Sequence, residues 1–266
     1  MNAPERLMLP DVQAQEDLRN LRIDNVGIKG VRYPIAIRSA AMVWHTSATF
    51  SMSVGLSAAA KGTHMSRFIE LLEAQPDALD HAGFMRMAAD MLTRLDAHSG
   101  TIEMRFPYFV KKSAPISGVK SLLDIDVCWR ASISEDGRKI SHLQVLVPAT
   151  SLCPCSRDIS DYGAHNQRSH ISIGATLTAE MSIEELVNIA ERSASCEVYG
   201  LLKRADEKYV TERAYDNPKF VEDIVRDVAL SLRQHPAVDD FIVEVENFES
   251  IHNHSAFARI SGIGQG

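Results

Sequence analysis

Apolar and polar residues alternate over long stretches of this chain, and few folds accommodate that pattern. Between residues 42 and 54 an apolar series alternates with a polar one; the apolar series is Trp44, Ala48, Phe50, Met52 and Val54, and the polar series is His45, Ser47, Thr49, Ser51 and Ser53. A period of two is typical of a β-strand that buries one face. The same pattern predicts strands at residues 102–106, 123–133, 143–147, 171–177, 240–248 and 255–260. We expect an earlier strand at 31–37 to lie at a sheet edge, because Pro34 cannot donate a ladder hydrogen bond.

Between these strands apolar residues recur at intervals of three and four, which is typical of helices that bury one face. This spacing predicts helices at residues 65–72, 84–95, 183–194, 206–214 and 218–232, the last with Pro218 in its first turn. Each half of the chain therefore has the order strand, strand, helices, strand, strand. That order favours an α+β fold with two antiparallel sheets and helices packed on one face of each. We expect an N-terminal arm at residues 1–27, a first module at 28–135 and a second module at 136–266.

Composition and charge exclude several classes of protein. With 266 residues, 45% of them hydrophobic, the chain can bury a large core and is not disordered. A formal net charge of −7 argues against a protein that binds nucleic acid by bulk attraction. The longest stretch without a charged residue, 39–60, holds too many serines and threonines for a membrane span. The acidic N-terminus lacks the pattern of a secretory signal, so we expect a cytoplasmic protein with no membrane partner.

The densest group of chemically active residues is SLCPCSRD at 151–158, followed by AHNQRSH at 164–170. Pro154 is expected to hold Cys153 and Cys155 in an extended run, so that both thiols point the same way. One thiol and a histidine could bind a metal, but a catalytic site uses three protein ligands and leaves a position for water. Glu207 and Glu222 are candidates for the third ligand, and spacing alone does not choose between them. The alternative is a pair of small buried residues beside a surface loop.

Two further groups could act on a substrate. If the chain is extended at His252 and His254, their imidazoles share one face about 7 Å apart and could serve as acid, base or phosphate contact. The alternative is a polar turn between the last strands. In KGTHMSRF, residues 61–68, backbone amides and the side chains of Thr63, His64 and Arg67 could bind an oxyanion. The alternative there is an ordinary helix start that Thr63 caps.

Taken together, the stretches KGTHMSRF, LCPCSRDISDYGAHNQRS and NFESIHNHSAFARI resemble the signature segments of GTP cyclohydrolase IB, the prokaryotic type of GTP cyclohydrolase I. The resemblance runs in matching order from about residue 30 to residue 262. It implies a tunnelling fold with two modules per chain, assembled as a homotetramer with active sites at subunit interfaces. It also implies that GTP is converted to 7,8-dihydroneopterin triphosphate and formate, the first step of folate biosynthesis.

By position, the resemblance implies a role for each candidate residue. Cys153, His165 and Glu207 would bind a divalent metal, whose identity among Zn, Mn and Fe a mixed sulfur, nitrogen and oxygen set does not decide. Glu222 would accept hydrogen bonds from guanine. The residues around the reacting base would be Cys155, His252 and His254, with Cys153 shared between metal binding and catalysis. The triphosphate would contact Thr63, His64 and Arg67.

Two other functions remain compatible with the sequence. A nitrile reductase of queuosine synthesis has the same fold and uses a cysteine nucleophile with a nicotinamide cofactor, so chelation would leave its turnover intact. A non-catalytic purine-binding or metal-binding protein would release no formate from GTP.

Overall fold

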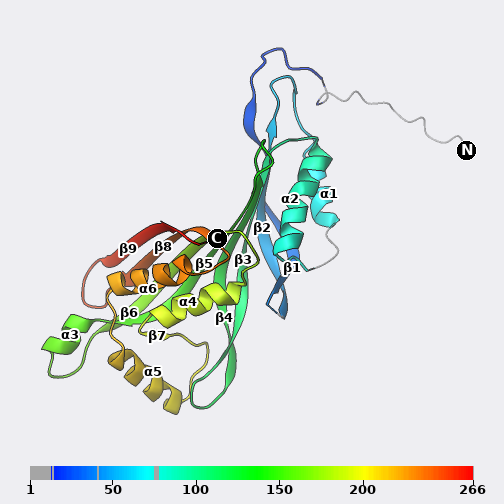
Figure 1. Ribbon diagram of the computed structural model, residues 1–266. Coiled ribbons are helices and arrows are strands. Elements are labelled where there is room, and N and C mark those ends of the chain that lie inside the picture. The colour runs from blue at the N-terminus through cyan, green and yellow to red at the C-terminus, as the bar shows by residue number, and fades with distance from the viewer. Residues whose placement is uncertain (1–12, 14, 41, 75–77, 266) are drawn as a thin grey trace, which may run out of the picture.

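The structure is a computed structural model that describes residue 13 and residues 15–40, 42–74 and 78–265. Its elements follow the predicted order (Figure 1). The first half contains β1 (Ile23–Ser39), β2 (Met42–Leu56), α1 (Ser66–Glu73), α2 (His81–Leu95), β3 (Gly100–Ser113) and β4 (Lys120–Ile133). The second half contains β5 (Lys139–Leu152), α3 (Pro154–Ile159), β6 (Asn166–Leu177), α4 (Ile183–Ser193), β7 (Cys196–Glu197), α5 (Arg204–Asp216), α6 (Val221–Arg233), β8 (Val238–Phe248) and β9 (Ser255–Ile263).

The strands form one antiparallel sheet in the order β1-β2-β3-β4-β5-β6-β8-β9, with β7 beside β5. The α+β class is confirmed, but the expectation of a separate sheet for each half is wrong. The halves join because β4 and β5 form a hairpin in which residues 126–133 pair with 139–146. Gly137 lies in the hairpin turn with a φ of +80°, a conformation that glycine adopts without strain. The expected boundary between residues 135 and 136 falls in this turn, and the division into modules stays a prediction.

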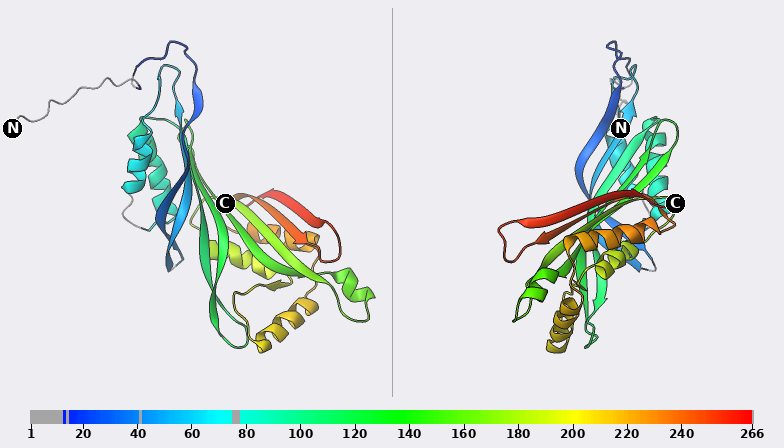
Figure 2. Two further views of the ribbon diagram at one scale, coloured as in Figure 1. Left: turned by 180° about the vertical axis from the view of Figure 1, so that it is seen from behind. Right: turned by 60° about the vertical axis from the view of Figure 1, so that its left-hand side comes forward.

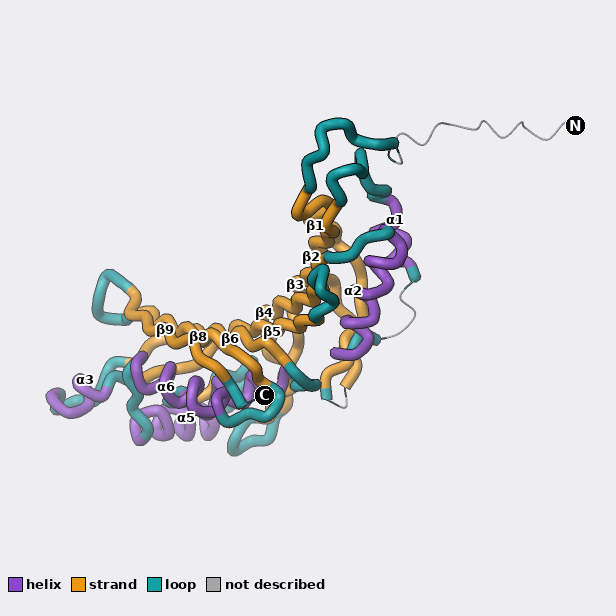
Figure 3. Tube along the Cα trace, turned by 45° about the horizontal axis from the view of Figure 1, so that its top comes forward, coloured by secondary structure: helices purple, strands orange, loops and turns teal. Residues whose placement is uncertain are grey.

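All the larger helices cover one face of this twisted sheet, as Figure 2 and Figure 3 show. The alternation explains why: in β3 the side chains of Ile102, Met104 and Phe106 are buried toward the helices, while Glu103 and Arg105 lie on the other face. Helices α1 and α2 cover the first half of the sheet, and α4 and α6 cover the second. In the part of the chain that the structure describes, no helix covers the opposite face.

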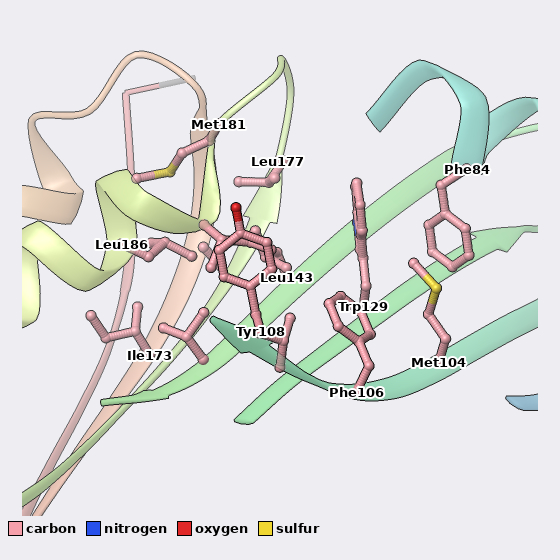
Figure 4. Packing of buried hydrophobic residues seen from close by; sticks show 14 of the residues in the cluster. Phe84, Met104, Phe106, Tyr108, Trp129, Leu143, Ile173, Leu177, Met181 and Leu186 are labelled. Carbon is pink, nitrogen blue, oxygen red and sulfur yellow. The ribbon is translucent and has the colours of Figure 1, made fainter. Parts of the chain in front are cut away.

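One core runs through both halves of the molecule. Buried residues from α2, β3, β4, β5, β6 and α4 belong to a single hydrophobic cluster. In Figure 4, Phe106, Tyr108 and Trp129 of the central strands lie between Phe84 of α2 and Leu186 of α4. Phe84 packs on Trp129 with ring centroids 5.0 Å apart. The two halves are therefore joined by packing as well as by strand pairing.

Two elements begin at other residues than expected. Strand β1 begins at Ile23, inside the expected arm, and it forms the sheet edge as Pro34 predicts. Before it, Lys61 N donates to Gln15 O and Asp17 N donates to Ala59 O, so this part of the arm lies against the β2–α1 loop. Residues 1–12 and 14 of the arm lie outside the described residues. Helix α6 begins at Val221, so Pro218 precedes its first turn.

No helix in the described part of the chain is long and apolar enough to cross a membrane.

Candidate active site

Cys153 lies where β5 gives way to α3. It is the N-cap of that helix, with φ −71° and ψ 119°, and Pro154 is the first helical residue. The expected extended run is therefore wrong: proline suits the first turn of a helix, where its missing N–H is not needed. The Cys153 Sγ accepts a hydrogen bond from Ser156 N at 3.5 Å and is half-buried, whereas Cys155 is exposed on α3. The two thiols do not share a strand face.

His165 lies directly beside Cys153, although the loop between them spans eleven residues. Cys153 N donates to His165 O at 3.1 Å, and His165 N donates to Ser156 Oγ at 3.2 Å. The imidazole Nδ1 is 3.0 Å from Gln167 Oε1. These bonds close the loop around α3 and hold a thiol and an imidazole at the same end of the β5–β6 hairpin.

Helix α5 packs against the chain neighbours of these two residues. Its Val210 and Ala214 belong to a small cluster with Leu152 and Ala164. Glu207 lies one turn before Val210 on the same helical face, and it is exposed. The C-terminal end of α5 also meets α3, because the Arg157 guanidinium lies 5.0 Å from the Tyr215 ring centroid. The packing of α5 therefore directs the face that carries Glu207 toward the end of β5.

Asp206 fixes the start of α5. Its carboxylate is fully buried and accepts hydrogen bonds from Ile116 N, Ser117 N and Ser117 Oγ in the β3–β4 turn and from Lys203 N. Burial by itself would raise the pKa of this carboxyl, but the bonds from Ser117, Lys203 and Ile116 outweigh it and hold the pKa well below the usual range. The turn of the first half thus positions the helix that carries Glu207.

Glu222 lies in the first turn of α6 and is exposed. The segment before the helix is tied to the same strand end, because Lys219 N donates to Leu152 O at 3.1 Å. Leu152 N in turn donates to Ser195 Oγ, so the residue before Cys153 is held on both sides. Glu222 therefore belongs to the end of the sheet where Cys153 and His165 lie.

His252 and His254 lie in the loop between β8 and β9, which is a bend and not an extended strand. Their rings are stacked with centroids 5.2 Å apart, and His252 Nδ1 is 3.5 Å from Glu249 Oε2. The polar-turn alternative is thus the right description of the backbone. The same loop reaches the cysteine and histidine pair, since Ser250 Oγ is 3.5 Å from His165 Nδ1.

Thr63, His64 and Arg67 lie elsewhere in the molecule. They precede or begin α1, which Figure 1 and Figure 3 show at the opposite end of the chain from α3. Thr63 is buried and does not cap the helix, because Met65 is the N-cap and makes no side-chain cap bond. Arg67 Nη1 donates to Arg94 O at 2.7 Å. One chain therefore does not bring the expected triphosphate contacts to the cysteine and histidine pair.

The sequence matches known proteins over nearly its whole length. The family model described as type I GTP cyclohydrolase folE2 matches residues 9–258. The chain belongs to this family. It is 60% identical to GTP cyclohydrolase FolE2 1 of Dechloromonas aromatica, with both chains covered completely. It is 55% identical to GTP cyclohydrolase FolE2 of Azoarcus sp., with 98% of this chain and 97% of that protein covered. It is 53% identical to GTP cyclohydrolase FolE2 of Neisseria meningitidis serogroup C (strain 053442), with 98% of this chain and 88% of that protein covered.

Solved structures support the fold of this FolE2 family member. Uricase from Arthrobacter globiformis superposes with a TM-score of 0.53 at 8% identity and covers 91% of this chain and 94% of its own. A hyper-thermostable uricase mutant superposes with a TM-score of 0.54 at 11% identity. The match covers 92% of this chain and 93% of the mutant's chain. The uricases are tunnelling-fold proteins, so the predicted fold class is confirmed at the level of the architecture.

The side chains at this end of the sheet provide some, but not all, of the ligands that a metal ion needs. Cys153 and His165 are adjacent, and the Gln167 contact to Nδ1 leaves Nε2 as the ring nitrogen that can bind a cation. In the arrangement of the described residues, however, no three His, Cys, Asp or Glu side chains lie close enough together to hold an ion. Glu207 is on the correct helical face but points into solvent, so metal binding requires its side chain to turn toward the pair.

Several residues at this end of the sheet escaped the sequence interpretation. The sequence pattern assigned no role to Asp206 beside Glu207. It also assigned none to a buried group that comprises Ser151, Gln167, Ser169 and Asn247. The sequence alternation could have indicated them, because these four polar residues occupy the alternate positions whose side chains point into the core. A polar residue at a core position indicates a hydrogen-bonded role.

Proposed function

We propose that this protein is a metal-dependent GTP cyclohydrolase I that converts GTP and water to 7,8-dihydroneopterin triphosphate and formate. The reaction is the first step of folate biosynthesis, which would place the protein in the cytoplasm. The observation that carries the proposal is family membership over residues 9–258. The meeting of Cys153, His165, α5, α6 and the β8–β9 loop at one end of the sheet supports it.

Cys153, His165 and Glu207 are the residues that would hold a divalent cation, with Zn, Mn and Fe as candidates. Thiolate favours softer ions and carboxylate accepts harder ones, so this donor set suits all three. A bound divalent cation would supply a water whose pKa is lowered toward about 7, the kind of nucleophile that hydrolysis at C8 of guanine needs. The exposed position of Glu207 supports an open site that substrate and water can enter.

The other residues of the site would bind the base and move protons. The Glu222 carboxylate can only accept hydrogen bonds when ionised, so it suits the N–H groups of the guanine ring. His252 and His254 are exposed on the loop that contacts His165, where they can exchange protons with the opening ring and with solvent. Cys155 is exposed on α3, two residues after Cys153, and would contact the reacting base.

The triphosphate contacts would come from a neighbouring subunit. Thr63, His64 and Arg67 lie at the far end of the molecule from Cys153. The two edge strands of the sheet are β1, which pairs with Leu79 at Ile37, and β9. The rest of such an edge can pair with another subunit. We propose a homotetramer in which α1 of one subunit faces the cysteine and histidine pair of another. Such an arrangement puts each active site at a subunit interface.

Metal analysis combined with two activity assays tests the proposal. Purified protein should contain a divalent metal, release formate from GTP and form a fluorescent pterin, and chelation should abolish turnover. Cys153→Ala and His165→Ala should each lose both metal and turnover, because they remove ligands. Cys128→Ala is the matched thiol control, since Cys128 lies on the opposite face of the sheet, and it should keep both. An inactive Cys153 or His165 variant that retained full metal would refute the ligand assignment.

A further inference from the structure

Four polar side chains occupy core positions next to His165. They are Ser151 of β5, Gln167 and Ser169 of β6, and Asn247 of β8, and we refer to them as the polar relay. Their exposed fractions are 0%, 7%, 0% and 3%. A buried polar group costs free energy unless it is hydrogen-bonded. Four such groups at core-facing positions of three adjacent strands therefore need a structural explanation.

Hydrogen bonds join the polar relay to His165 in one continuous path. His165 Nδ1 lies 3.0 Å from Gln167 Oε1, and Gln167 Nε2 donates to Ser151 Oγ at 2.9 Å. The Ser151 and Ser169 hydroxyls are 3.0 Å apart, and Ser169 Oγ donates to Asn247 Oδ1 at 2.7 Å. The strand register makes this possible, because Ser151 pairs with Gln167 and Ser169 pairs with Asn247.

With the Gln167 and Asn247 amides oriented as they are in this structure, proton counting gives the path a single direction. Asn247 Oδ1 can only accept, so the one hydroxyl proton of Ser169 is used there. Ser151 must then donate its proton to Ser169, and it accepts from the Gln167 amide. This leaves the Gln167 carbonyl oxygen facing the imidazole, where it requires a proton on Nδ1.

We propose that the polar relay fixes His165 as the tautomer with its proton on Nδ1, and so holds Nε2 as the lone-pair nitrogen that faces a metal. The residues of the relay are positioning residues, and the inference rests on the proposed function only in what Nε2 binds. A neutral imidazole has one donor and one acceptor nitrogen, and a ligating nitrogen must be the acceptor. Fixing the tautomer therefore prepares the ligand before the metal arrives.

The relay also connects the metal ligand to the loop of the proposed acid and base groups. Asn247 is two residues from Glu249, the partner of His252 Nδ1, and the same loop carries Ser250 to His165 Nδ1. The path thus runs from β6 across the sheet to the root of the β8–β9 loop. A substitution in the relay should therefore change the hydrogen bonding of His165 even where the substituted residue does not contact it.

The tautomer can be measured directly in metal-free protein. Nitrogen-15 NMR of histidine-labelled protein, at a pH where imidazoles are neutral, distinguishes a protonated ring nitrogen from one with a lone pair. We expect the His165 signals, identified by their loss in His165→Asn, to show a protonated Nδ1 and a lone-pair Nε2. A protonated Nε2 in the wild-type protein would mean that the path runs in the opposite direction, and it would overturn the proposal.

Ser169→Ala tests whether the relay sets the tautomer. The change removes a hydroxyl that lies three hydrogen bonds from the imidazole, so Ser151 and the Gln167 amide are free to turn and a population with Nε2 protonated should emerge. Ser172→Ala is the matched control: Ser172 lies on the same strand, accepts from Gln144 Nε2 at 3.1 Å and lies outside the relay. Ser151→Ala is a second variant should Ser169→Ala fail to fold. An unchanged tautomer in a folded relay variant would overturn the proposal.

Binding of Zn²⁺ alone, measured by competition with a chromophoric chelator, gives an independent readout. Loss of an outer hydrogen bond to a metal ligand typically weakens binding by about 10-fold or more, and we expect that loss for Ser169→Ala and none for Ser172→Ala. Equal affinities in the two variants would count against the relay. If the wild-type tautomer is as proposed but Zn²⁺ does not bind, the relay stands and the proposed metal site is refuted.

Discussion

Glu222 shows how a single residue can be tested separately from the metal ligands. Its helix is anchored beside Cys153 through Lys219, but its carboxylate is exposed in the first turn of α6. A negative charge there is favoured by the helix dipole. Its chemistry suits recognition of the base more than binding of the cation.

We expect Glu222→Gln to weaken GTP binding by about 10-fold or more, because an amide N–H would oppose a guanine N–H and a buried donor would lose its partner. Metal content should not change. Titration of GTP into the variant and metal analysis of the same sample would check this. Glu212→Gln is the control, since Glu212 pairs with Lys208 on the exposed side of α5. Unchanged GTP affinity in Glu222→Gln would remove the guanine assignment.

Glu103 is the residue with the clearest electrostatic role on the open face of the sheet. Its carboxylate accepts from Arg105 Nε at 2.9 Å and Arg130 Nε at 3.2 Å. Burial alone would raise the pKa of Glu103, but the hydrogen bonds and charges of Arg130 and Arg105 lower it below its usual value. A lowered pKa means that the ionised form stabilises the fold at neutral pH.

Glu103→Gln should destabilise the protein by about 1 kcal/mol at neutral pH, lowering the melting temperature by about 2–4 °C. The stabilisation by Glu103 is fully present above the unfolded pKa of about 4.3 and is lost as the pH falls through the folded value. The gap between wild type and variant should therefore shrink in acid. Thermal melts at several pH values would measure it. Glu244→Gln removes a more exposed cross-strand partner of Arg259 and should change little. A gap independent of pH would contradict the electrostatic explanation.

At the scale of elements, one buried ion pair holds α4 of the second half against β3 of the first. Lys112 of β3 donates to Glu191 of α4, and both residues are 9% exposed. The Lys112 ammonium also lies 4.9 Å from the Tyr199 ring centroid. Tyr199 OH donates to Glu197, which accepts from Arg213 of α5 at 3.0 Å. This network and Asp206 connect both ends of α5 to the rest of the protein.

Lys112→Met should destabilise the protein by about 3 kcal/mol, because it leaves a buried carboxylate without its partner. The double variant Lys112→Met with Glu191→Leu should recover much of that loss, since a pair of apolar groups has no desolvation cost. Chemical denaturation of the two single variants and the double variant would give the coupling free energy. Additive losses in the double variant would show that the pair contributes through packing alone.

The proposed site residues fall into two groups that lie at opposite ends of the molecule. Cys153, His165 and α5 lie at one end, and the α1 segment with Arg67 lies at the other. No bending of a chain with one continuous sheet and one continuous core would bring these ends together. The proposed tetramer resolves this by placing different subunits at each site.

We expect mixed subunits to complement each other. Arg67→Ala and His165→Ala should each be nearly inactive, but refolding or coexpressing them together should restore part of the activity, because some interfaces then combine two intact half-sites. Cys153→Ala with His165→Ala is the control and should not recover, since both changes affect the same half-site. Light scattering would give the mass of the mixed assembly. A monomer, or a tetramer without complementation, would contradict the shared site.

Local patterns in the sequence predicted much of the fold. Alternation identified the eight long strands, helical spacing identified five of the six helices, and Pro34 placed β1 at an edge. These features depend on neighbours in the chain, which is why they can be predicted from the sequence. Helix α3 was missed because six residues carry too little periodicity, and Pro154 was interpreted as extending the chain and not as starting a helix.

The sequence by itself determined the strands, the larger helices and the family. Only the tertiary structure decided that one sheet spans both halves, that α5 packs beside the Cys153 end of β5, and that a path of hydrogen bonds reaches His165 from Asn247. Those contacts join residues far apart in the chain. They depend on the register of β5, β6 and β8 and on the packing of α5, which no local pattern specifies because hydrogen bonds and packing form only when the strands have already met.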